Sequence, residues 1–145
     1  MRNSLIVIVL ALLPLAAACG GRASLPVDPA DCQATAPHRV GSTLALDIVP
    51  PDSTIKGLLL DGATATAGRP FPVRWVMDAR RAGTEMRMRA VRQGTDQVVG
   101  LAWRGTTSGQ LAEFPAQITF PAAGCWAADI SSGTAGGEVV LRVNP

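Results

Sequence analysis

Three kinds of side chain in this 145-residue chain could carry reactive chemistry: three cysteines, one histidine and one lysine. A catalytic triad needs a base, but the histidine, His38, lies in a proline-flanked segment that is typical of an exposed loop. Lys56 could activate Ser53, but no turn or spacing signal marks either residue as buried. The carboxylates are scattered without metal-ligand spacing, and no glycine-rich phosphate loop follows a strand. The sequence therefore predicts a protein that is not an enzyme and needs no metal or cofactor.

Arginine accounts for twelve of the thirteen basic residues, and several lie in one short stretch. Arg87, Arg89 and Arg92 are candidates for a binding surface, because guanidinium groups bind carboxylates and phosphates through paired hydrogen bonds. Such a surface would suit an acidic partner or an anionic lipid surface. The favoured alternative is a solvated sheet face, since Asp78 and Glu85 lie nearby in the sequence.

Trp103 is a further candidate for a surface contact, because an exposed aromatic ring beside an arginine can anchor a partner. Its alternation with Val99 and Leu101 favours a different position, in the core or over a sheet edge. Both interpretations stay open at the level of sequence.

The overall charge of the chain is small. Its 13 Lys and Arg residues against 11 Asp and Glu give a formal net charge of +2, which argues against nucleic acid as a partner. Charged residues make up 17% of the chain, below the roughly 25% of an average soluble protein, and the 15 Gly and 11 Pro have no repeating period. Neither a collagen-like chain nor a highly charged disordered chain fits this composition.

The N-terminus has the pattern of a secretory signal peptide over residues 1–18. Arg2 supplies the positive charge, residues 5–15 form an apolar run, and Ala16 to Ala18 lead into Cys19. The run is shorter than the roughly 20 apolar residues that a transmembrane helix needs. We therefore expect an exported protein.

The junction Leu15-Ala16-Ala17-Ala18-Cys19 resembles the lipobox of bacterial lipoproteins. The resemblance implies cleavage before Cys19 and acylation of that cysteine, so that membrane lipid holds the domain outside the cytoplasm, at the cell membrane or the outer membrane. The alternative is an ordinary signal peptide cut after Ala18, which would leave Cys19 as a free thiol. An odd thiol is a liability in an oxidising compartment, and this argues for acylation. With Cys19 acylated, Cys32 and Cys125 are the remaining pair, and we expect them to form a disulfide.

Residues 19–31 mix glycine and proline without an apolar period, which predicts a flexible lipidated tether. Residues 32–145 are expected to fold as one all-β domain, because apolar residues recur at every second position in short runs. The expected strands are Thr43–Val49, Ile55–Leu60, Ala63–Ala67, Phe71–Met77, Glu85–Arg92, Gln97–Trp103, Ala116–Phe120, Cys125–Ser131 and Glu138–Val143.

Alternation is clearest in the middle of the chain. Trp75 is expected on the core face of its strand, with Met86 and Met88 on the core face of the next and Arg87 and Arg89 on its outer face. We expect these strands and Gln97–Trp103 to be successive hairpin-connected strands of one sheet, with Trp75 and Trp126 as the main core residues.

The stretch Phe120-Pro121-Ala122-Ala123-Gly124-Cys125-Trp126 resembles a motif of uncharacterised bacterial lipoproteins, where it opens the penultimate strand of an immunoglobulin-like domain. The resemblance implies an antiparallel immunoglobulin-like sandwich of about seven to nine strands. The order Cys32, Trp75, Cys125 matches that of immunoglobulin domains, but Cys32 precedes every expected strand. The disulfide is therefore expected to fasten an N-terminal segment to the sheet.

Together these features predict a membrane-anchored cell-envelope lipoprotein, a non-enzymatic binding or structural module of unknown ligand. One alternative is an accessory subunit or inhibitor of an envelope enzyme or transporter, which would depend on one specific protein. A small hydrolase using Lys56 or His38 is a weaker alternative, because a fold alone supports no activity.

Overall fold

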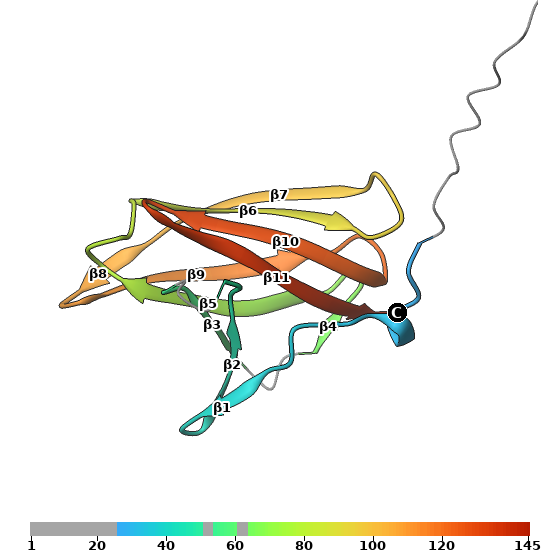
Figure 1. Ribbon diagram of the computed structural model, residues 1–145, viewed down its shortest axis with the longest axis horizontal. Helices are drawn as coiled ribbons and strands as arrows, with labels where there is room; N and C mark the ends of the chain where they lie inside the picture. Colours follow the sequence, from blue (N-terminus) through green and yellow to red (C-terminus); the bar gives the residue numbers. More distant parts are fainter. Residues whose placement is uncertain (1–25, 51–53, 61–63) are drawn as a thin grey trace, which may run out of the picture.

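The computed structural model describes residues 26–50, 54–60 and 64–145. These residues form two β-sheets that pack face to face around one hydrophobic core (Figure 1). Apart from the 3₁₀ turn η1, Pro29–Asp31, the regular elements in these ranges are all strands. The expected all-β sandwich is therefore confirmed.

The first sheet has the strand order β1-β2-β3-β5-β9-β8 and the second the order β4-β11-β10-β6-β7. The strands of the first sheet are β1 (His38–Val40), β2 (Thr43–Asp47), β3 (Lys56–Leu59), β5 (Pro70–Asp78), β9 (Leu111–Thr119) and β8 (Thr106–Ser108). Those of the second are β4 (Ala65–Thr66), β11 (Ala135–Asn144), β10 (Gly124–Ser132), β6 (Glu85–Arg92) and β7 (Val98–Arg104).

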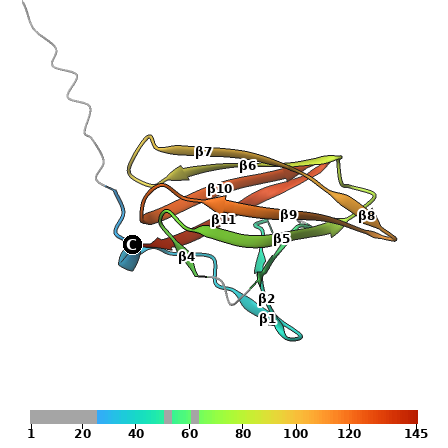
Figure 2. The ribbon, with the colours of Figure 1, turned by 180° about the vertical axis from the view of Figure 1, so that it is seen from behind.

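The strand order follows the immunoglobulin plan. Strands β3, β5, β9 and β8 occupy the places of A, B, E and D, and β11, β10, β6 and β7 those of G, F, C and C′. Strand β4 runs parallel to β11 and covers part of its edge, whereas the other strand pairs are antiparallel (Figure 2). The described residues contain eleven strands, more than the seven to nine expected, because β1 and β8 are short, polar and without a clear alternation.

The expected single sheet in the middle of the chain is wrong. Strands β6 and β7 do form a hairpin, but β5 pairs with β3 and β9 in the other sheet. The connection between Asp78 and Glu85 therefore crosses from one sheet to the other. Alternation identifies the core face of each strand, but it does not say which strands share hydrogen bonds.

Strand β9 is longer than the expected Ala116–Phe120, because Pro115 does not end it. The pairing of β9 with β8 stops at Glu113, so Pro115 lies where that side of the strand has no neighbour and no N–H is needed. The other expected strands are present with small shifts at their ends, and position 63 of Ala63–Ala67 lies outside the described residues.

Trp75 and Trp126 are both fully buried in the core between the sheets, as expected. Trp126 packs against Phe120 at a ring-centroid distance of 5.1 Å, and its Nε1 donates a hydrogen bond of 3.1 Å to the carbonyl of Ala122. Trp75 lies opposite Gly57 in the pairing of β5 with β3. A Cβ on Gly57 would lie 2.5 Å from a ring carbon of Trp75, so only glycine leaves room for this indole.

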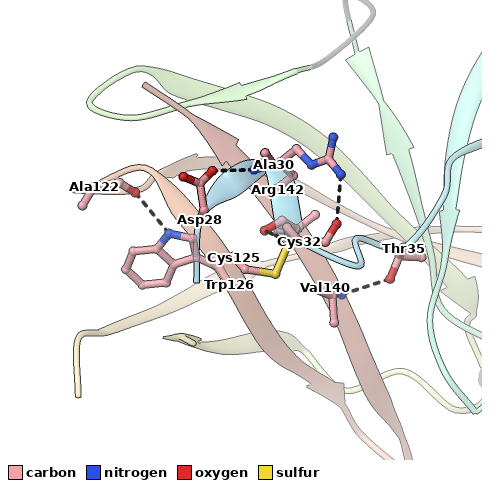
Figure 3. Close-up of a disulfide and its surroundings, with 10 residues drawn as sticks. Asp28, Ala30, Cys32, Thr35, Ala122, Cys125, Trp126, Val140 and Arg142 are labelled. Carbon is pink, nitrogen blue, oxygen red and sulfur yellow. Dashed lines mark hydrogen bonds between the residues drawn. A yellow bond between two sulfur atoms is a disulfide. The ribbon is translucent and has the colours of Figure 1, made fainter. Parts of the chain in front are cut away.

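The expected disulfide between Cys32 and Cys125 is present, and it fastens the N-terminal segment to β10 (Figure 3). Arg142 Nη2 donates to the Cys32 carbonyl at 2.9 Å, and the Val140 N–H donates to Thr35 Oγ1 at 3.0 Å. Contacts with the domain begin before Cys32, because the Val27 N–H donates to the Gln93 carbonyl at 3.3 Å. Part of the expected tether therefore lies against the sandwich.

Replacing Gly57 with Ala is expected to lower the free energy of unfolding by about 1 to 3 kcal/mol, because the added methyl group forces the Trp75 ring out of its position. Chemical denaturation of the two proteins measures the difference. Gly100→Ala is the matched control, since a Cβ there meets no atom within 4 Å. Equal losses in the two variants would contradict the proposed role of Gly57.

Replacing both Cys32 and Cys125 with Ala is expected to lower the free energy of unfolding by about 2 to 5 kcal/mol, because the unfolded chain regains the freedom of a loop spanning 93 positions. Denaturant unfolding of the oxidised wild type and the double variant tests this. Reduction of the wild type should produce a similar loss. A double variant as stable as the oxidised wild type would contradict the expectation.

Candidate functional site

The candidate surface lies on the outer face of the second sheet. Strand β6 points Met86, Met88 and Ala90 into the core, and Arg87 and Arg89 into solvent, as the alternation predicts. Strand β10 lies beside β6, so Asp129 is opposite Arg89 and Ser131 is opposite Arg87. On the other side, Gly100 and Ala102 of β7 are opposite the same two arginines.

These residues form a hollow of about 460 Å³ over β6, β7 and β10. A second hollow of about 300 Å³ adjoins it and shares Arg87 and Ser131. The first hollow is deep because Gly100 has no side chain and Ala102 has only a methyl group, so the space beside the arginines is not filled. We call this surface the arginine trough and define it by Arg87, Arg89, Gly100, Ala102, Asp129 and Ser131.

The two arginines of the trough differ in their partners. Arg87 Nε donates to Glu85 Oε1 at 2.7 Å, so part of its charge is already compensated on the surface. Arg89 has no carboxylate within 4.0 Å among the described residues. Asp129 likewise has no basic side chain within 4.0 Å among these residues. The Arg89 guanidinium is thus available to a ligand, for which its planar fork suits a carboxylate or a phosphate.

Arg92, the third arginine predicted from the sequence, lies away from the trough. It is opposite Trp126, on the core-facing side of β6, and is half-buried. Its Nε lies 2.6 Å from the position that a Cβ on Gly124 would occupy, and Gly124 has a φ of +143°. Arg92 thus packs over the turn into β10. Successive side chains of a strand point to opposite faces, and Arg92 is an odd number of positions from both Arg87 and Arg89. The sequence alone therefore places Arg92 on the other face of the strand.

Trp103 is half-buried and packs against the core cluster, on the side of β7 opposite to Ala102. This position agrees with the alternative of a core or edge-covering side chain. The residues that sequence reasoning missed are Gly100, Ala102, Asp129 and Ser131. The small residues at every second position of β7 could have indicated Gly100 and Ala102, but the pairing of β7 and β10 with β6, which adds Asp129 and Ser131, could not be read from the sequence.

The other residues considered for chemistry lie on the first sheet or outside the described ranges. His38 Nδ1 is 3.4 Å from Asp47 Oδ2, and Lys56 Nζ is 3.8 Å from Asp47 Oδ1. All three side chains are about half exposed, and exposed pairs of this kind are typical of a solvated surface. Cys19 and Ser53 lie outside the described residues. Within the described ranges, no three His, Cys, Asp or Glu side chains gather as a metal site would require.

Comparison of the chain with protein-family models, curated proteins and solved structures finds no match. Among residues 26–50, 54–60 and 64–145, no helix has the length and hydropathy to cross a membrane.

The connection that leads into β6 is organised by Asp78 and Arg80. The Asp78 carboxylate accepts hydrogen bonds from the Arg80 backbone N–H at 2.9 Å and from its Nη2 at 2.7 Å. The side-chain bond, and then the backbone bond, lower the pKa of Asp78 from 3.8 to about 2. This turn begins the crossing that brings β6 into the second sheet.

Replacing Arg80 with Gln is expected to raise the pKa of Asp78 toward 3.8, because the carboxylate loses its charged donor. An NMR titration of the Asp78 carboxyl carbon measures this change. Since the folded pKa is the lower one, the stabilisation from the pair is complete above pH 3.8 and is lost as the pH falls through about 2. Arg74→Gln, an exposed arginine on β5, is the control. An unchanged titration in Arg80→Gln would contradict the assignment.

Proposed function

We propose that this protein is an exported, lipid-anchored domain of the bacterial cell envelope that binds a partner and catalyses no reaction. The observation that carries the proposal is the attachment of the N-terminal segment at one end of the sandwich, which leaves the arginine trough open on its side. The signal peptide and the lipobox resemblance supply the membrane anchor at Cys19.

The place of attachment limits how an anchored domain would be oriented. Cys19 precedes Pro26, the first described residue, by seven positions, and an extended chain of that length spans at most about 25 Å. Residues 26–32 lie at the end of the sandwich that also holds the C-terminus and the β6–β7 turn (Figure 1). An acylated Cys19 would therefore hold this end close to the membrane.

The trough would then lie on the flank of the domain. Arg89 and Arg87 are four and six positions along the chain from Gln93, which places them about 13 and 20 Å from the anchored end at the rise of an extended strand. A protein next to the domain in the envelope could therefore contact Arg87 and Arg89 more readily than the lipid headgroups of the membrane to which the domain is anchored. This arrangement also supports the alternative of an accessory subunit or inhibitor, which would use the flank to bind one envelope enzyme or transporter.

Replacing Cys19 with Ser is expected to move the protein from the membrane fraction to the soluble fraction, because the acyl chains hold it there. Fractionation of cells that produce each protein measures the distribution. The double variant Cys32→Ala/Cys125→Ala is the control, since it keeps Cys19 and should stay with the membrane.

The intact mass of the wild type tests the same proposal independently. We expect a chain that begins at Cys19 and carries acyl groups, with Cys32 and Cys125 protected from alkylation until reduction. An unacylated chain beginning at another residue would overturn the lipid anchor.

A further inference from the structure

Strand β7 has one edge without a partner among the described residues, because β6 is the only strand that pairs with it. The Arg92 N–H donates to the Gln97 carbonyl, and the Gly105 N–H donates to the Thr84 carbonyl, at the two ends of this hairpin. Hydrogen-bonded pairs alternate in an antiparallel ladder, so Val99, Leu101 and Trp103 face β6 with their backbone groups. The backbone N–H and C=O groups of the residues between them point to the open edge: Val98, Gly100, Ala102 and Arg104.

The opposite edge of the same sheet is covered. Strand β4 pairs with β11 at Val143 and Asn144, the Thr35 N–H donates to the Val140 carbonyl, and Val49 exchanges backbone hydrogen bonds with Glu138. Uncovered edges invite pairing with another chain, and natural sheets commonly protect them with proline, lysine or a bulge. Strand β7 has neither proline nor lysine, and its one charged residue, Arg104, is the last residue of the strand. Its open edge is therefore suited to receiving a strand.

The two faces of this edge differ in chemistry. On the outer face, Gly100 and Ala102 are small, and Arg89 and Arg87 lie directly behind them in the neighbouring strand. On the inner face, Val99, Leu101 and Trp103 are only half-buried against the core. An added strand would place alternate side chains over the arginine trough and the others against these three apolar residues.

We propose that β7 accepts an extended segment of a partner protein in which acidic and apolar residues alternate. Carboxylates opposite Gly100 and Ala102 reach across the hollow to Arg89 and Arg87, and the apolar residues between them cover Val99, Leu101 and Trp103. The backbone of the segment pairs with the open N–H and C=O groups of β7. This inference deepens the proposed function and rests on it for the presence of a binding partner.

Charge argues for a partner protein over the two other possible strands. A second copy of this chain pairing through its own β7 would add a strand that contains no Asp or Glu, so it would supply no carboxylate to Arg89 or Arg87. Residues 1–25 of this chain contain no Asp or Glu, so they cannot supply the carboxylates. Anionic lipid headgroups could meet the arginines, but they cannot pair with the backbone of β7.

The test uses the full chain in detergent and a fluorescent peptide of seven alternating Val and Glu residues flanked by Gly-Ser linkers. Fluorescence anisotropy measures binding, and hydrogen exchange followed by NMR measures protection of the Gly100 and Ala102 amides. We expect saturable binding, protection of both amides, and an affinity reduced about tenfold in Arg87→Gln/Arg89→Gln. Arg74→Gln is the matched control on the other sheet and should bind as the wild type does.

Two further changes separate the parts of the proposal. Gly100→Glu supplies a carboxylate to Arg89 from within the chain, in a space that a side chain can enter, and should weaken binding of the peptide. The same peptide with methylated backbone nitrogens on the residues that pair with β7 should not bind, because it cannot donate to the strand edge.

Several outcomes would overturn the proposal: equal binding of a peptide with Lys in place of Glu, full affinity of the methylated peptide, or no binding at all. Binding of anionic vesicles that depends on Arg87 and Arg89, without binding of the peptide, would identify a lipid-facing surface instead. A dimer that disappears in Gly100→Glu would identify a second copy as the occupant.

The strand addition and the lipid anchor can fail separately. A chain that binds the peptide but carries no acyl group on Cys19 would overturn the anchor and keep the strand addition. An acylated chain that does not bind the peptide would overturn the strand addition and keep the anchor.

Discussion

Strand β10 secures the sandwich on both of its faces through two adjacent residues. Trp126 points inward and fills the core beside Phe120, while Cys125 points outward and is bonded to Cys32. Because successive side chains of a strand point to opposite faces, one short sequence fastens the two sheets together and the N-terminal segment to the second sheet. Strand β10 also pairs with both β6 and β11, so the position of the arginines depends on it.

The fastening divides the outer face of the second sheet into two regions. Near the disulfide, residues 26–35 lie against Cys125 and the edge of β11. Farther along β6, small residues on β7 leave the arginine trough uncovered. The covered region holds the chain in place and the open region offers charge and backbone groups, so attachment and binding would not compete for the same surface.

The open edge of β7 is the feature that gives the arginines a specific use. Exposed arginines on a sheet are common and usually serve only as a solvated face, to which Arg87 with its partner Glu85 partly conforms. Arg89 lines the same hollow as Arg87 but differs from it in having no carboxylate within 4.0 Å among the described residues. Small residues next to a strand edge turn an ordinary charged face into one that could distinguish an acidic strand from other partners.

The alternation of apolar residues along the sequence by itself determined the all-β class, the core positions of Trp75 and Trp126, and the outward direction of Arg87 and Arg89. Each of these depends on the two-residue period of a single strand. Cysteine counting, with the lipobox resemblance, predicted the pair Cys32 and Cys125, since few combinations were possible. Only the tertiary structure decided that β5 and β6 belong to different sheets. It alone placed Gly100, Ala102 and Asp129 beside Arg87 and Arg89. These facts depend on hydrogen bonds between strands distant in the sequence, and the alternation within one strand carries no information about its neighbour.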